Sequence, residues 1–132
     1  MKHHCPLPTL FLLVGACIAL PVHAFERVQA GQWTGKTLSG GKTFPTSSCI
    51  SPHDAQLLNG DAKSVRAYLE TIIPASICKI SDVKAEGNQI IYTASCGSNA
   101  ATVVTTSYYG SRSEGFDSTG GKSEAKWVGP CK

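Results

Sequence analysis

Apolar and polar residues alternate along most of this chain, with glycine-bearing turns about every ten residues. A period of two is typical of strands that bury one face, and β-branched and aromatic residues favour the same structure. The alternation predicts a mainly β fold, a curved antiparallel sheet of about six to seven strands. The expected strands cover residues 28–38, 42–48, 79–85, 89–95, 101–109, 112–118 and 124–128.

Residues 51–73 interrupt the alternation and predict a short two-helix insertion, which makes the fold α+β. Ser51 followed by Pro52, with Asp54 three residues after the serine, is typical of an N-cap, a first-turn proline and an acid near the positive helix end. A second helix should begin after Asp61 and pack on the sheet through apolar residues at helical spacing. These are Val65, Tyr68, Leu69 and Ile72.

The same stretch holds the residue types of a nucleophilic active site, Ser51, His53 and Asp54. A triad needs the base beside the nucleophile and a third group that orients the base, and near neighbours on one helical turn point apart. We therefore interpret Ser51 and Asp54 as a helix cap and His53 as an exposed first-turn residue. The nine acids are scattered singly, so no catalytic residue is predicted and the chain is not expected to be an enzyme.

Residues 1–24 have the pattern of a secretory signal peptide. Lys2 precedes an apolar run over 7–20, and small residues lie at the cleavage positions in 22–24. The run is shorter than the roughly 20 residues that a membrane-spanning helix needs. We expect cleavage after Ala24, which leaves a single domain over 25–132 that is periplasmic or secreted, without a transmembrane helix.

An alternative reading of the leader remains open. Val14-Gly15-Ala16-Cys17 resembles a bacterial lipobox, whose cysteine would carry lipid and fix the protein to a membrane. The apolar residues that follow Cys17 argue against it, because polar residues normally follow a lipobox cysteine.

Four cysteines follow the leader: Cys49, Cys78, Cys96 and Cys131. An even number in an exported chain predicts two disulfides. If Gly87 and Asn88 form a two-residue turn, Glu86 faces Gln89, and the cysteines at the ends of that hairpin point to opposite faces. Of the two pairings that this leaves, we prefer the one without crossed links, Cys49–Cys78 and Cys96–Cys131. A three-residue loop would instead restore a Cys78–Cys96 pair.

Metal and nucleic-acid binding are not expected. The four cysteines lack the close spacing of a zinc knuckle, and His53 is the one histidine after the leader. Beyond Lys2, eleven basic residues stand against nine acidic ones, a net charge of about +2 without runs of like charge. No cofactor is predicted.

Several short motifs occur in an order that resembles a known family. They are AGQW, CISPHDA, CKISDVKAEGNQIIYTASC, TSYYG and WVGPC. The order is similar to the bacterial exported family called domain of unknown function 3617. His53 stands where that family often has glutamate, and the segment before the last strand is short. The resemblance implies an envelope location in a Gram-negative bacterium and carries no activity.

The leading functional hypothesis is a monomeric, non-enzymatic binding module for an apolar ligand or an envelope protein. Aromatic residues dominate contact surfaces, and four could form one, although core packing is the alternative for each. They are Trp33, Tyr108, Tyr109 and Trp127. An inhibitor or immunity protein that blocks an envelope hydrolase, and a structural envelope protein, are the other hypotheses.

Overall fold

The structure, a computed structural model, describes residues 26–132. The predicted signal peptide and Cys17 lie outside the described residues. The elements in chain order are β1 (Gly31–Ser39), β2 (Lys42–Ile50), α1 (Pro52–Leu58), α2 (Ala62–Ile72), β3 (Cys78–Glu86), β4 (Gln89–Cys96), β5 (Thr102–Tyr108), β6 (Arg112–Asp117) and β7 (Lys122–Gly129). The predicted antiparallel sheet with a two-helix insertion is confirmed, with seven strands. No helix within 26–132 is long and apolar enough to cross a membrane.

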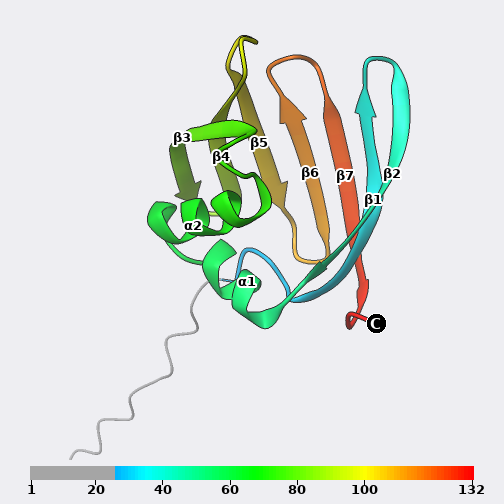
Figure 1. Ribbon diagram of the computed structural model, residues 1–132. Coiled ribbons are helices and arrows are strands. Elements are labelled where there is room, and N and C mark those ends of the chain that lie inside the picture. Colours follow the sequence, from blue (N-terminus) through cyan, green and yellow to red (C-terminus); the bar gives the residue numbers. More distant parts are fainter. Residues whose placement is uncertain (1–25) are drawn as a thin grey trace, which may run out of the picture.

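The strands form one open sheet in the order β2-β1-β7-β6-β5-β4-β3 (Figure 1). Strands β2 and β3 are its two edges, so the helices that connect them carry the chain from one edge to the other. In doing so they cross a single face, which we call the helix face. We call the opposite face the outer face. Both helices lie in front of the sheet in Figure 1 and leave β6 and β7 largely uncovered.

The hydrophobic core lies between the helices and the helix face. Strand register places Trp33, Ile80 and Ile90 on that face. The helices and the segment before β1 supply the other side of the core. The buried apolar residues are Val28, Trp33, Ile50, Ala55, Leu58, Val65, Leu69, Ile80 and Ile90. This core belongs to one face alone.

Both helices begin at capping side chains. The Ser51 Oγ accepts a hydrogen bond from the Asp54 amide at 3.1 Å, and the Asp61 carboxylate accepts one from the Ser64 amide at 2.9 Å. Each bond satisfies an amide that the first turn leaves without a partner inside the helix. The side chain of His53 is exposed.

The apolar stripe of α2 differs from the prediction at its last residue. Val65 and Leu69 are buried and Tyr68 packs against them, but Ile72 is 55% exposed. The helix ends at this residue, and the chain turns into an extended conformation at Ile73. Ile73 therefore packs on the core in place of Ile72.

The β3–β4 hairpin explains why the preferred disulfide pairing is wrong. Glu86 faces Gln89, as the two-residue turn predicts, but Asp82 and Val83 together oppose one residue of β4. Asp82 has a φ of 51° at this bulge. The extra residue shifts the register of the far half by one, so Cys78 lies opposite Cys96 and the two form a disulfide.

The second disulfide joins Cys49 to Cys131. Gln32 in β1 pairs with Cys49 on one side and with Gly129 on the other. The tail after β7 therefore has only one strand to cross before it reaches Cys49. This link holds the C-terminus against the edge strand β2.

The two disulfides should contribute unequally to stability. They close sequence separations of 82 residues for Cys49–Cys131 and 18 for Cys78–Cys96. On the chain-entropy relation these loops are worth about 4.5 and about 3 kcal/mol. Paired Cys→Ser substitutions should lower the free energy of unfolding in that order, as measured by urea denaturation. Peptide mapping that recovers a Cys49–Cys78 link would contradict the structure.

Candidate functional site

The two tryptophans hold the segment that precedes β1. Trp33 is 3% exposed, and its indole nitrogen donates to the Gln29 carbonyl at 2.9 Å. The indole nitrogen of Trp127 donates to the Ala30 carbonyl at 2.9 Å. Both side chains pack in or against the core. Each tryptophan was expected either to form a contact surface or to pack in the core. Trp33 packs in the core, because too little of its side chain is exposed to contact a partner.

Tyr109 and Tyr108 lie in different surroundings although they are neighbours in sequence. Tyr109 is 49% exposed at the β5–β6 turn, and the guanidinium carbon of Arg112 lies 5.1 Å from its ring centroid. Tyr108 points to the helix face, where its ring meets Trp33 edge to face at a centroid distance of 6.3 Å. Of the four candidate aromatic residues, Tyr109 is the most exposed.

Tyr108 belongs to a cluster of three tyrosines that the sequence analysis did not recognise. Tyr92 on β4 shares the helix face with it, and Tyr68 reaches over from α2. Burial raises the pKa of each phenol, and the proximity of Tyr68 and Tyr92 raises the pKa of Tyr108 further. Arg27 lowers that pKa by a smaller amount. The cluster favours the neutral phenol form, which fits core packing.

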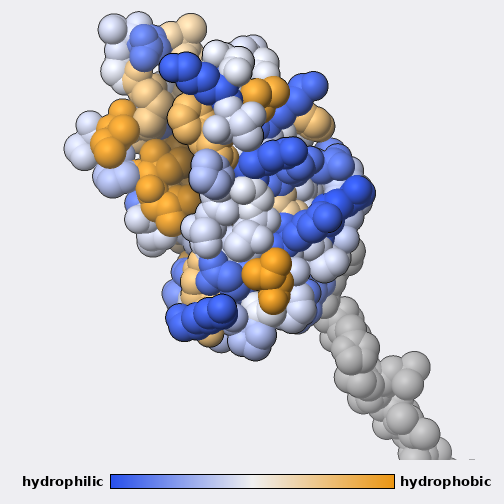
Figure 2. All heavy atoms as spheres, turned by 90° about the vertical axis from the view of Figure 1, so that its right-hand side faces the viewer, coloured by the Kyte–Doolittle hydropathy of each residue, from blue (hydrophilic) through white to orange (hydrophobic). Residues whose placement is uncertain are grey.

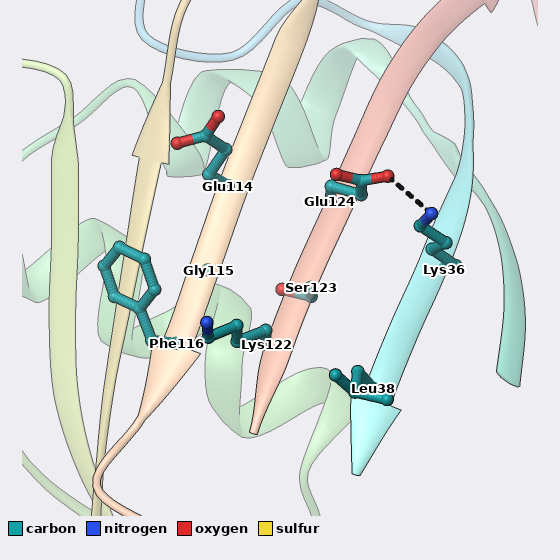
Figure 3. A pocket seen from close by; sticks show the side chains of 8 residues that line it. All are labelled: Lys36, Leu38, Glu114, Gly115, Phe116, Lys122, Ser123 and Glu124. Carbon is teal, nitrogen blue, oxygen red and sulfur yellow. Dashed lines mark ion pairs between the residues drawn. The ribbon is translucent and has the colours of Figure 1, made fainter. Parts of the chain in front are cut away.

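The outer face carries a different set of side chains, which the register places together on β6, β7 and β1 (Figure 3). Two adjoining grooves of about 250 and 340 Å³ lie among them and share Lys36, Glu114 and Glu124. We call this set the outer band. It consists of Lys36, Leu38, Arg112, Glu114, Phe116, Lys122, Glu124 and Lys126.

Ion pairs in the outer band satisfy only part of its charge. Lys36 contacts Glu124 at 3.2 Å, and Arg112 contacts Glu114 at 3.7 Å. Across the β6–β7 pair, however, Glu114 lies opposite Glu124, and Arg112 lies opposite Lys126. Like charges that face each other across two strands are destabilising. The band thus contains two cross-strand repulsions next to each other.

Two large apolar side chains are exposed beside these charges. Leu38 is 41% exposed and Phe116 is 50% exposed. Both lie level with Lys122, one on each neighbouring strand, and Figure 3 shows the lysine reaching toward the phenylalanine. The outer band therefore combines charge with apolar contact area.

The two faces of the sheet differ in character when the molecule is viewed from the β2 edge. Figure 2 shows apolar residues gathered toward the left, the side of the helices, and hydrophilic residues over the right. Within residues 26–132, no three His, Cys, Asp or Glu side chains are placed to hold a metal ion. The groups that the outer band offers are ammonium, guanidinium, carboxylate and apolar side chains, which can bind a complementary surface.

A family model described as a protein of unknown function, DUF3617, matches residues 28–131. The chain belongs to the DUF3617 family. No curated protein and no solved structure matches the chain significantly. The DUF3617 match includes all seven strands, both helices and both disulfides.

The outer band of this DUF3617 protein left a signal in the sequence that the sequence analysis did not use. Arg112, Glu114 and Phe116 are spaced by two, and so are Lys122, Glu124 and Lys126. Such spacing places each trio on one face of its strand. The two trios become one surface because β6 and β7 are neighbours, and Lys36 and Leu38 join them because β1 pairs with β7.

The tyrosine cluster predicts a loss of stability at alkaline pH. The folded pKa of Tyr108 is raised above its unfolded value of about 10. The cluster's contribution is therefore fully present below about pH 10 and is lost as pH rises toward the folded pKa. The free energy of unfolding should fall by up to about 1.4 kcal/mol per pH unit for each such phenol.

Urea denaturation of the wild type and of Tyr108→Phe at several pH values above neutrality measures this effect. The phenylalanine variant should show a shallower decline than the wild type. Identical slopes for the two proteins would contradict the assignment.

Proposed function

We propose that this protein is an exported, non-enzymatic binding module. Its outer band binds an acidic surface of an envelope protein. The observation that carries the proposal is the pair of cross-strand repulsions, Glu114 opposite Glu124 and Arg112 opposite Lys126. Both pairs destabilise the sheet, because like charges that face each other across two strands repel, whereas opposite charges would attract. Residues that conflict with local stability are expected at functional sites.

The charge of the outer band indicates the chemistry of its partner. Four of its side chains are basic and two are acidic, which leaves a net charge of +2. The two acids already contact Lys36 and Arg112, whereas Lys122 and Lys126 have no ion pair within residues 26–132. An acidic partner surface would contact these two lysines.

The shape of the outer band favours a protein over a small apolar ligand. Small-molecule sites are concave, largely apolar cavities that bury most of the ligand. The outer grooves lie on a sheet surface, and six of the residues that line them are charged. Leu38 and Phe116 can instead serve as apolar anchors at the centre of a protein interface with the charges as its rim.

Export is supported by the disulfides, which form and persist in oxidising compartments such as the periplasm. The signal peptide over 1–24 and the alternative lipid attachment at Cys17 fall outside the described residues. A periplasmic or secreted location is the setting we propose for the interaction.

Site-specific photo-crosslinking in an envelope extract tests the proposed function. A photoreactive phenylalanine analogue replaces Phe116 in one protein and Phe44 in the control, since both side chains are 50% exposed. Phe44 lies on the helix face, because it pairs with Thr37, which is four residues after Trp33 in β1 and therefore on the same face. We expect a discrete cross-linked protein from position 116 that is absent from position 44 and that weakens as salt is raised.

Charge reversal decides whether the contact has the proposed chemistry. Lys122→Glu combined with Lys126→Glu should remove the cross-link, whereas Lys42→Glu on β2 should leave it unchanged. Equal cross-linking from both phenylalanine positions would contradict the proposal. So would cross-linking that survives the double reversal, or binding to anionic lipid vesicles with no protein cross-link at all.

A further inference from the structure

Another groove lies away from the outer band, where helix α2 packs against the edge strand β3. Its volume is about 550 Å³. The lining residues include Arg66 and Glu70 from α2, Ile73 directly after it, and Cys78, Lys79 and Ile80 from β3. The groove is therefore bounded by a helix on one side and by an unpaired strand edge on the other.

The register of β3 shows which main-chain groups face that free edge. The Cα atoms of Cys78 and Cys96 lie 4.1 Å apart, the short spacing of a pair that exchanges no main-chain hydrogen bonds. Because such pairs alternate with bonded ones, the same holds for Ile80 and Ala94 two residues further. The N–H and C=O of Ile80 therefore point away from β4, toward the open edge.

These two groups of Ile80 have an unmet demand for hydrogen bonds. Ile80 is 5% exposed, and outside the sheet ladder no main-chain group of residues 26–132 pairs with it. The neighbouring Cys78 amide, by contrast, donates to the Pro74 carbonyl at 3.1 Å. Buried main-chain N–H and C=O groups nearly always form hydrogen bonds, and a buried group without a hydrogen bond costs free energy.

An extended polypeptide is the ligand that can satisfy both groups at once. One residue of an added antiparallel strand would accept from the Ile80 N–H and donate to its C=O, which is how peptides extend exposed sheet edges. The side chain of that residue would lie on the helix side, against Ile73. The bulge at Asp82 ends the regular edge, so the added strand would be short.

The charges along the edge distinguish between the polypeptides that could bind there. Lys79 is exposed on the outer side of β3 and has no ion pair within residues 26–132. Arg66 and Glu70, across the groove, lie 3.7 Å apart and balance each other. A second copy of this chain would place another Lys79 beside this edge. Lysines on edge strands disfavour such edge-to-edge pairing, because their charges repel. An acidic segment complements Lys79.

We propose that the groove between α2 and β3 binds a short, extended, acidic peptide segment that adds an eighth strand to the sheet at Ile80. Alternate apolar side chains of the peptide occupy the groove, and its acidic side chains lie beside Lys79 on the outer side. This site is independent of the outer band, because the two share no residue.

Amide chemical shifts and hydrogen exchange of the isotope-labelled protein test the proposal. The probe is a blocked synthetic peptide of alternating valine and aspartate. One matched peptide has lysine for each aspartate, and another has proline at the central valine, which removes the N–H that Ile80 requires. We expect the valine–aspartate peptide at millimolar concentration to shift the Ile80 amide and slow its exchange, and both matched peptides to bind at least about fivefold more weakly.

A charge reversal in the protein supplies the matched control. Lys79→Glu should invert the order so that the lysine peptide binds better, while Lys126→Glu in the outer band should leave peptide binding unchanged. The proposal is overturned if the peptide leaves the Ile80 amide unaffected or if its shifts fall on β6 and β7. Equal binding of the proline peptide, or no inversion in Lys79→Glu, would overturn it as well. None of these results depends on the outer band.

Discussion

The fold is held together by the packing of α2, α1 and the segment before β1 onto one face of the sheet. Val65 and Leu69 from α2, Leu58 from α1 and Val28 from the N-terminal segment meet the strands there. Trp33 contributes its buried ring and fixes Gln29 by a hydrogen bond. The helices connect the two edge strands, β2 and β3, and the burial of apolar surface beneath them supplies the main driving force for folding.

Because the core lies on one face of the sheet, the side chains of the other face do not need to pack in it. The outer face can therefore carry opposed like charges and exposed apolar side chains that a packed face could not contain. A one-sided core is also small, which gives the two disulfides their role. One holds the C-terminal tail to the edge strand β2, and the other closes the hairpin that forms the opposite edge. Stability and surface chemistry are thus placed on different faces.

Much of this fold could be predicted from the sequence because the signals are local. Alternation gave the strands, glycine-led turns gave the hairpins, and Ser51 and Asp61 marked the helix starts. The disulfide pairing could not be derived, because it depends on one bulge residue, Asp82, whose left-handed conformation no local pattern indicated. The outer band was missed for another reason. Its β6 and β7 residues are neighbours in a hairpin, but Lys36 and Leu38 join them only because β1 pairs with β7, strands far apart in the sequence.

We expect packing on the helix face to stabilise the protein and the outer band to contribute little to its stability. Equilibrium unfolding of two matched variants, Leu58→Ala and Leu38→Ala, tests it most directly, since Leu58 is 3% exposed in the core and Leu38 is 41% exposed in the outer band. We predict a loss of about 2–5 kcal/mol for Leu58→Ala and a change within about 0.5 kcal/mol for Leu38→Ala. Equal losses would mean that the outer band stabilises the fold as much as the core does, contrary to this expectation.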